Sequence, residues 1–309
     1  MCRINLKGKS ILGIANLNKD EILYILDKAQ EFLSLIEEKS LNFPSLKDKT
    51  VVNLFFEPST RTKSSFELAE KYLGMKIINI AEKTSSLVKG ETIKDTAKNL
   101  RSLNIDLIVI RCAFSGVPHM LSKAIDIPII NAGDGMHEHP TQALLDMLTI
   151  KQEKGDFKNL RVGIMGDILH SRVARSDILA LKKLGAEVFL IGPNTLIPEF
   201  FKELGVSEIF NRIEDVIDIL DVLILLRMQR ERQRGIYYPS LREYIKYFSL
   251  RKEILNKAKK DIMIMHPGPV HKGVEAEAEV FDFDRSFILK QVKNGLAIRS
   301  ALIYLILGE

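Results

Sequence analysis

The chain has 309 residues, of which 46% are hydrophobic and 28% charged, and its formal net charge at pH 7 is +5. This length fits two domains with a cleft between them, and this composition excludes disordered and fibrous proteins. The sequence shows no apolar run near the roughly 20 residues of a membrane helix, no secretory signal at its start, and only Cys2 and Cys112 as cysteines. We therefore expect a cytoplasmic protein without disulfides or a membrane segment, whose small positive charge suits a small anionic substrate better than nucleic acid.

Short apolar runs rich in β-branched residues alternate with helical patterns along the chain. Because these runs lack an alternation of apolar and polar residues, we predict an α/β fold with two domains, each an open parallel sheet covered by helices on both faces. Ligands should then bind beyond the carboxyl ends of the strands. In chain order, the expected elements are helix 18–38, strand 50–56, helix 59–73, strand 76–80, helix 92–103, strands 106–110 and 127–130, helix 140–151, strand 161–165, helix 171–184, strands 187–191, 221–226 and 262–265, and helix 285–307.

A polar, glycine-containing segment at residues 152–159 separates the two halves and follows the helix expected to begin near Pro140. We assign residues 1–145 to a first domain and residues 146–285 to a second. The C-terminal helix, within 286–309, should pack back onto the first domain.

The segment between the first strand and the next helix has the composition of a phosphate site. In Glu57-Pro58-Ser59-Thr60-Arg61-Thr62, hydroxyls and a guanidinium stand at a helix N-terminus, where backbone N–H groups and the helix dipole favour an anion. For the hydroxyls alone, the ordinary N-cap would be the preferred interpretation. Arg61 favours the phosphate interpretation, because a cation at a helix N-terminus is unfavourable unless an anion is bound.

The run FFEPSTRTKSSFE at residues 55–67 resembles the phosphate-binding signature of the aspartate and ornithine carbamoyltransferases. Further segments that resemble this family follow in the family's order and extend the resemblance along the chain: SSLVKGET at 85–92, Arg111, HPTQ at 139–142, Arg172, RMQ at 227–229 and HPGP at 266–269. The resemblance implies that the first domain binds carbamoyl phosphate and that the second binds the amine substrate, without a cofactor and without a covalent enzyme intermediate.

The second substrate is expected to be L-aspartate. Lys89-Gly90-Glu91 and the pair Arg227 and Gln229 resemble the aspartate enzymes, whereas the ornithine enzymes typically carry a cysteine in the segment that is HPGP here. Two carboxylates call for guanidinium donors, and Arg172 and Arg227 each follow a strand of the second half. The implied products are N-carbamoyl-L-aspartate and phosphate, in an early step of de novo pyrimidine biosynthesis. The alternative is carbamoyl transfer to ornithine or an acylated ornithine.

The resemblance also implies a role for each matched residue. The catalytic set is Arg61, Thr62, Lys89, His139 and Gln142. Carbamoyl phosphate is expected to contact Ser59, Thr60, Arg61, Thr62, Ser85, Lys89, Arg111, His139, Gln142, Pro267 and Gly268, and aspartate to contact Lys89, Arg172, Arg227 and Gln229.

His137 and His139 also have the spacing of two ligands that can converge on one metal ion. No third ligand follows at a recognisable spacing, so we expect no metal and assign His137 a structural or exposed position. A dinucleotide fingerprint beginning at Gly163 fails, because Met165 and Ile168 stand where glycines are needed.

Two further alternatives belong to other classes of protein. The arginine-rich stretch 227–234 is compatible with nucleic-acid binding, but Glu231 interrupts it and no aromatic residue interleaves. A catalytically silent scaffold for a pyrimidine-pathway enzyme is disfavoured, because the phosphate-binding hydroxyls and His139 are retained.

The family resemblance implies a homotrimer in which Ser85 and Lys89 reach into the neighbouring subunit's site, and regulatory or dihydroorotase chains as possible partners. The sequence departs from the usual family pattern at Lys63, at Cys112-Ala113 and at His271-Lys272. Relatives commonly carry His-Pro in place of Cys112-Ala113, Asn-Arg in place of His271-Lys272 and Arg in place of Lys63. The last two departures keep the positive charge but lose the guanidinium geometry, which matters only if those groups make bidentate contacts.

Overall fold

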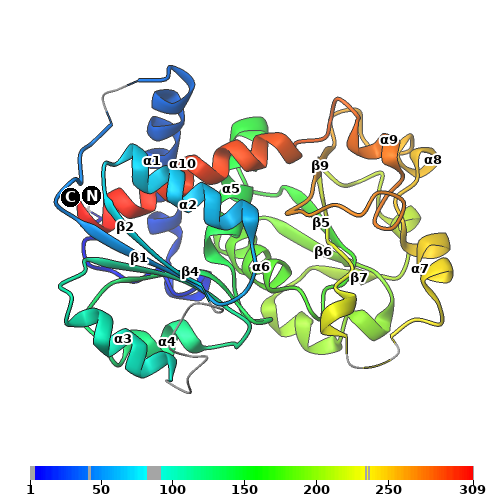
Figure 1. Ribbon diagram of the computed structural model, residues 1–309. Helices are drawn as coiled ribbons and strands as arrows, with labels where there is room; N and C mark the ends of the chain where they lie inside the picture. The colour runs from blue at the N-terminus through cyan, green and yellow to red at the C-terminus, as the bar shows by residue number, and fades with distance from the viewer. Residues whose placement is uncertain (1–3, 41–42, 82–91, 234, 236, 309) are drawn as a thin grey trace. The chain divides into compact units, whose positions relative to one another are not determined.

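The computed structural model describes all residues except 1–3, 41–42, 82–91, 234, 236 and 309. The chain forms two compact units (Figure 1): unit 1 comprises residues 1–148 and 293–309, and unit 2 comprises residues 149–292. Helices α5 (Pro140–Lys154) and α10 (Ile288–Leu307) contain the two crossings between the units. Among the described residues, no helix combines the length and the apolar character needed to span a bilayer.

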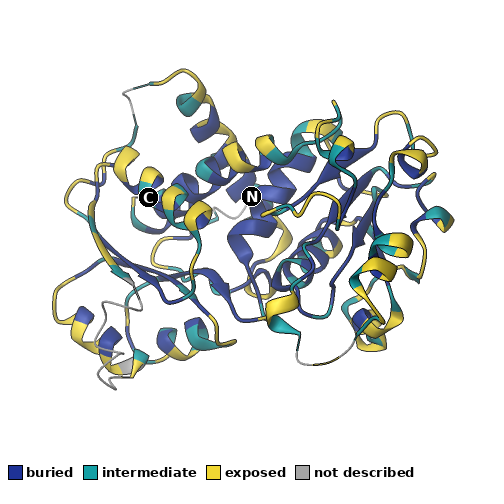
Figure 2. Ribbon diagram, turned by 45° about the vertical axis from the view of Figure 1, so that its right-hand side comes forward, coloured by how far each residue is buried: buried dark blue, intermediate teal, exposed yellow. Residues whose placement is uncertain are grey.

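Unit 1 contains a parallel sheet in the order β2-β1-β3-β4. Figure 1 shows α3 and α4 on one side of this sheet and α1, α2 and α10 on the other. Strands β1, β3 and β4 are almost wholly buried (Figure 2), as their mostly apolar sequences predicted. The edge strand β2 differs, because residues 76–80 are exposed or half-buried. The elements are α1 (Lys19–Glu37), β1 (Thr50–Phe55), α2 (Thr60–Tyr72), β2 (Lys76–Ala81), α3 (Ile93–Arg101), β3 (Leu107–Cys112), α4 (Val117–Ser122) and β4 (Ile129–Asp134).

Unit 2 contains a parallel sheet in the order β7-β6-β5-β8-β9. Its core joins the apolar residues of these strands to those of the following short helices. The elements are β5 (Arg161–Met165), α6 (Arg172–Leu184), β6 (Glu187–Ile191), β7 (Glu208–Phe210), β8 (Val222–Leu225), α7 (Leu241–Phe248), α8 (Lys252–Leu255), β9 (Met263–Met265) and α9 (Ala278–Phe281). Short 3-10 helices lie at Ile14–Asn16, Asn194–Leu196, Glu199–Leu204, Ile213–Asp215 and Arg230–Arg232.

Both sheets have a point at which the order of the strands reverses. In unit 1 the reversal falls between β1 and β3, and in unit 2 it falls between β5 and β8. Loops on either side of such a point diverge to opposite faces of the sheet, which leaves a crevice at the carboxyl ends of the two strands. The predicted fold class is confirmed, and these two crevices are where ligand-binding residues are expected.

Candidate active site

The N-terminus of α2 carries the residues expected to hold the phosphate. Ser59 occupies the N-cap position with an extended backbone, but its side chain makes no capping hydrogen bond. In four other helices the N-cap side chain does accept a backbone N–H: Asn18 of α1, Thr92 of α3, Ser171 of α6 and Ser240 of α7. The Ser59 hydroxyl is therefore not used to close its own helix, which weakens the N-cap alternative.

The other residues of this segment differ in exposure. Thr60 and Arg61 are exposed, whereas Thr62 is 7% exposed. The segment follows β1 directly, so its hydroxyls and its guanidinium lie at the carboxyl end of a strand that borders the crevice.

Arg111 comes to the same edge from β3. It pairs in register with Phe55 of β1, its Nη2 donates to Glu57 Oε1 at 3.0 Å, and its Nη1 donates to the carbonyl oxygen of Ala132 in β4 at 3.2 Å. The guanidinium is thus fixed beside the segment that begins at Ser59. A cation held at the switch point, where the strand order reverses between β1 and β3, is suited to binding a phosphate.

His139 and Gln142 approach from the start of α5, and both are buried. Arg111 Nη1 lies 3.5 Å from His139 Nε2, at the outer limit of a hydrogen bond. Gln142 Nε2 donates to both carboxylate oxygens of Asp146, at 3.1 and 3.2 Å. Because a carboxylate only accepts, this contact orients the amide and directs Gln142 Oε1 away from Asp146 as an acceptor. An acceptor is what the amide group of a carbamoyl substrate requires.

Arg299 of α10 is a buried cation of unit 1 that the sequence analysis did not single out. It is 4% exposed, and its guanidinium lies 5.1 Å from the centroid of the Phe66 ring in α2. Burial lowers the pKa of Arg299 to about 10, the Arg61 guanidinium lowers it too, and the Asp146 carboxylate opposes both. Arg299 therefore adds positive charge near Arg61 and near the Asp146 carboxylate that accepts from Gln142. Its signal in the sequence was a single arginine within an apolar helical stretch.

In unit 2, Asp167 connects the two loops that border the crevice. It follows β5 and is fully buried. Its Oδ1 accepts from His170 Nδ1 at 2.7 Å, while its Oδ2 accepts from the backbone N–H of Gln229 at 3.2 Å and from Gln233 Nε2 at 2.9 Å. One carboxylate thus holds the loop after β8 against the loop after β5. This role could not be predicted from the sequence, because Gln229 and Gln233 are far from Asp167 in the chain.

The structure brings Arg172 and Gln229 to the carboxyl edge of β5 and β8. Arg172 is the first residue of α6 and is 5% exposed, and the preceding Ser171 caps the helix by accepting from Ala174 N–H at 3.1 Å. Gln229 is half-buried.

Arg227 also follows β8 and is half-buried. Its Nη2 is paired with Glu231 Oε1. A substrate carboxylate at this guanidinium would therefore compete with a carboxylate of the protein's own loop.

The HPGP segment follows β9, beside β8. His266 is buried, and its Nδ1 accepts from Gly268 N–H at 2.8 Å. Gly268 has a φ of +66°, which favours glycine, and the Gly268–Pro269 peptide bond is cis. Pro267 and Gly268 are half-buried.

Glu275 ties this segment to the loop after β8. It is 2% exposed, and it accepts from His271 N–H at 2.6 Å and from Met228 N–H at 3.2 Å. Burial raises the pKa of Glu275 above its ordinary value, although these backbone hydrogen bonds oppose the shift.

Ser85 and Lys89 lie outside the described residues. The residues at the three departures from the family pattern make contacts within their own units. Lys63 Nζ lies 3.7 Å from Glu67 Oε1, Cys112 Sγ donates to the carbonyl oxygen of Phe114 at 3.3 Å, and Lys272 Nζ donates to Asp282 Oδ1 at 3.1 Å.

His137 has neighbours that its spacing in the sequence did not reveal. One ligand atom from each of His119, Asp134 and His137 lies within 4.8 Å of the others. His139, in contrast, contacts Arg111. His137 is therefore grouped with His119 and Asp134 and not with His139.

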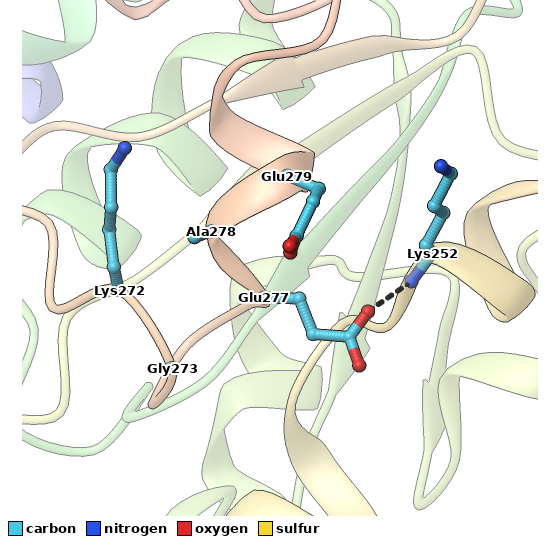
Figure 3. A pocket seen from close by; sticks show the side chains of 6 residues that line it. All are labelled: Lys252, Lys272, Gly273, Glu277, Ala278 and Glu279. Carbon is cyan, nitrogen blue, oxygen red and sulfur yellow. Dashed lines mark hydrogen bonds between the residues drawn. The ribbon is translucent and has the colours of Figure 1, made fainter.

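Figure 3 shows a hollow of unit 2. Its volume is ≈ 560 Å³, and two lysines and two glutamates line it. The backbone N–H of Lys252 donates to Glu277 Oε2 at 2.8 Å across it. The lining residues are Lys252, Lys272, Gly273, Glu277, Ala278 and Glu279, and none of them belongs to the predicted set.

The sequence matches two family models in succession. Residues 9–152 match the carbamoyl-P binding domain of the aspartate/ornithine carbamoyltransferases, and residues 158–306 match their Asp/Orn binding domain. The chain is 50% identical over 300 residues to the aspartate carbamoyltransferase catalytic subunit of Syntrophotalea carbinolica, covering 97% of this chain and 96% of the relative. It is 49% identical over 301 residues to the corresponding subunit of Acetivibrio thermocellus, with the same coverage.

Solved structures agree with the family models. The aspartate transcarbamoylase of Trypanosoma cruzi, in complex with N-(phosphonacetyl)-L-aspartic acid, superposes with a TM-score of 0.90 at 30% identity, covering 98% of this chain and 97% of that one. The ornithine carbamoyltransferase of Pyrococcus furiosus superposes with a TM-score of 0.86 at 30% identity, covering 99% of each chain. The chain belongs to the aspartate/ornithine carbamoyltransferase family.

Proposed function

We propose that the protein transfers the carbamoyl group of carbamoyl phosphate to the α-amino group of L-aspartate, giving N-carbamoyl-L-aspartate and phosphate. The observation that carries the proposal is the gathering of Ser59–Thr62, Arg111 and His139 at the switch point of unit 1. Relatives about half identical over nearly the whole chain are named as catalytic subunits of the aspartate enzyme, which supports the choice of aspartate. Unit 1 would bind carbamoyl phosphate, and unit 2 would bind aspartate.

In the proposed reaction the phosphate is held by Ser59, Thr60, Arg61, Thr62 and Arg111. Gln142 Oε1 accepts from the carbamoyl amide, and Arg61, Thr62 and His139 meet the developing oxyanion. The α-amino nitrogen attacks the carbamoyl carbon, a C–N bond forms, and the bond between that carbon and the phosphate oxygen breaks. The departing phosphate takes the proton of the amine, so no covalent enzyme intermediate is needed.

The aspartate carboxylates would be bound by Arg172, Arg227, Gln229 and Lys89, and the backbone carbonyls of Pro267 and Gly268 would orient the amine. Holding two reactants in attack geometry contributes on the order of 7–11 kcal/mol, so positioning is expected to matter as much as any single side chain.

The test is carbamoylation of L-aspartate against L-ornithine at matched concentrations, with carbamoyl phosphate saturating. We expect N-carbamoyl-L-aspartate as the main product. Preferential use of ornithine would reject aspartate as the substrate, and transfer to neither amine would support the silent scaffold.

We also propose a homotrimer whose sites are shared, with Ser85 and Lys89 supplied by the neighbouring subunit. The support is the family resemblance together with the mostly polar character of residues 82–91, which join β2 to α3. The cytoplasmic location and any association with regulatory or dihydroorotase chains stay predictions from the sequence.

A mixing experiment tests the shared site. Arg61→Ala and Lys89→Ala chains, each nearly inactive alone, are refolded together. In a head-to-tail ring, a site is intact only if one chain supplies Arg61 and its neighbour supplies Lys89. Each of these holds for about half of the chains in an equal mixture, so about a quarter of the sites should be intact. If mixed trimers form and their activity does not exceed the mean of the parents, each chain builds its site alone.

A further inference from the structure

Two histidines and an aspartate of unit 1 form a cluster apart from the residues assigned to carbamoyl phosphate. His119 belongs to α4, Asp134 ends β4, and His137 lies in the loop before α5. His137 Nδ1 is 3.0 Å from Asp134 Oδ2, and the two imidazole rings have centroids 5.4 Å apart. Neighbouring ligands of a tetrahedral zinc ion, with bonds of about 2.0–2.2 Å, stand roughly 3.3 Å apart. Since all three donor atoms lie within 4.8 Å of one another, small side-chain rotations would bring them to one ion.

The carboxylate of this cluster is held in place by its surroundings. Asp134 is fully buried, its Oδ1 accepts from Asn131 Nδ2 at 2.8 Å and from Glu138 N–H at 3.1 Å, and its Oδ2 accepts from Gly116 N–H at 2.7 Å. A carboxylate oriented by neighbouring donors is what a metal ligand requires.

His119 supplies an independent observation. Its Nδ1 is buried and has no hydrogen-bond partner among the residues that the structure describes. Buried imidazole nitrogens are normally satisfied, so an unpartnered one indicates a missing ligand or water. Ring packing against His137 alone would leave this nitrogen unexplained.

The cluster also has a route to solvent and a stable frame. The His137 side chain is 39% exposed and His119 is half-buried, so an ion can enter without unfolding. The loops that carry the ligands are joined by backbone contacts, including Gly135 N–H to the carbonyl oxygen of Cys112 at 2.9 Å.

We propose that His119, Asp134 and His137 bind one divalent transition-metal ion of the zinc class, with water completing the coordination. Two imidazoles and one carboxylate favour zinc over magnesium and calcium, which prefer oxygen ligands. The ion joins α4 to the loop before α5 and stabilises unit 1. It is separate from carbamoyl transfer, because His139 faces Arg111 instead.

The test is a titration of the full-length protein, first stripped with EDTA and dialysed, with Zn²⁺ against a chromophoric chelator. We expect one ion per chain, a higher melting temperature with zinc, and Co²⁺ absorption typical of mixed nitrogen and oxygen ligands. His119→Ala and His137→Ala should each weaken binding at least about ten-fold and abolish the thermal shift. The matched control is His271→Ala, since the His271 side chain is 50% exposed and lies in unit 2.

Two outcomes would overturn the proposal. One is binding of less than one ion per chain, and the other is unchanged affinity in both variants, which would locate the ion elsewhere. Asp134→Asn is not needed, because loss of this buried carboxylate endangers the fold. Carbamoyl transfer in EDTA should keep its rate, and a loss restored by zinc would show that the ion is not separate from the reaction.

Discussion

Glu70 of α2 makes the stability of unit 1 depend on pH. It is fully buried, its Oε2 accepts from Asn53 Nδ2 at 2.8 Å, and its Oε1 has no hydrogen-bond partner among the described residues. Burial raises the pKa of Glu70 from 4.5 to about 7; the hydrogen bond from Asn53 opposes this shift, and the charge of Glu67 adds to it. The folded state therefore holds the proton more tightly than the unfolded state. The stability that Glu70 contributes in its protonated form is fully present below pH 4.5 and is lost as the pH rises through about 7.

The size of this loss follows from the two pKa values. At roughly 1.4 kcal/mol per pKa unit, the difference between 4.5 and about 7 corresponds to about 3 kcal/mol. Glu70→Gln removes the titration and keeps the shape of the side chain. On going from pH 4.5 to pH 8, the native protein should lose this free energy of unfolding and the variant should not. The difference in free energy of unfolding, variant minus native, should therefore be about 3 kcal/mol larger at pH 8 than at pH 4.5.

The assay is the melting temperature of both proteins at pH 4.5 and pH 8, where about 2–4 °C corresponds to 1 kcal/mol for a protein region of 150–250 residues. Glu31→Gln is the control, because the Glu31 side chain is 65% exposed on α1. A difference between variant and native protein that is the same at both pH values would refute the argument.

Three further predictions concern the reaction. Arg61→Ala should lower turnover by roughly a hundred-fold without unfolding the protein, as seen by steady-state kinetics beside circular dichroism; near-normal turnover would remove Arg61 from the mechanism. Arg227→Ala should raise the KM for aspartate far more than that for carbamoyl phosphate, and equal effects would mean that the assignment is wrong. Glu231→Gln should lower the KM for aspartate several-fold, because the substrate no longer competes with the paired carboxylate; an unchanged or higher KM would contradict this competition.

The fold was predictable because its main signal is local. Buried parallel strands appear as mostly apolar runs, and the predicted bounds of β5 and β6 agree with the structure. Strand β7 (Glu208–Phe210) and the short helices α4, α7, α8 and α9 were not predicted from the sequence. Most of these elements have too few residues to show a period, and their conformation depends on packing against the rest of the unit.

The candidate site could be predicted only where its residues are contiguous or carry a family motif. Three buried charged residues contact partners that are distant in the sequence: Asp167, Glu275 and Arg299. Nothing in the sequence around them distinguishes them from other charged residues. The same holds for His119, which approaches His137 only because α4 packs beside β4. Spacing along the chain cannot reveal a contact that the topology creates.

The uncapped start of α2 leads to a last prediction. Local rules favour a capping serine, and Ser171 obeys them in α6, but the Ser59 side chain makes no such bond. A local rule broken at a helix N-terminus is expected where the free groups serve a ligand. Ser171→Ala should therefore lower the melting temperature of the protein without ligand, by an amount equivalent to about 1 kcal/mol. Ser59→Ala should leave that temperature almost unchanged and instead reduce the rise that inorganic phosphate produces. If Ser59→Ala destabilises the ligand-free protein as much as Ser171→Ala does, Ser59 is an ordinary cap and the phosphate assignment of its hydroxyl fails.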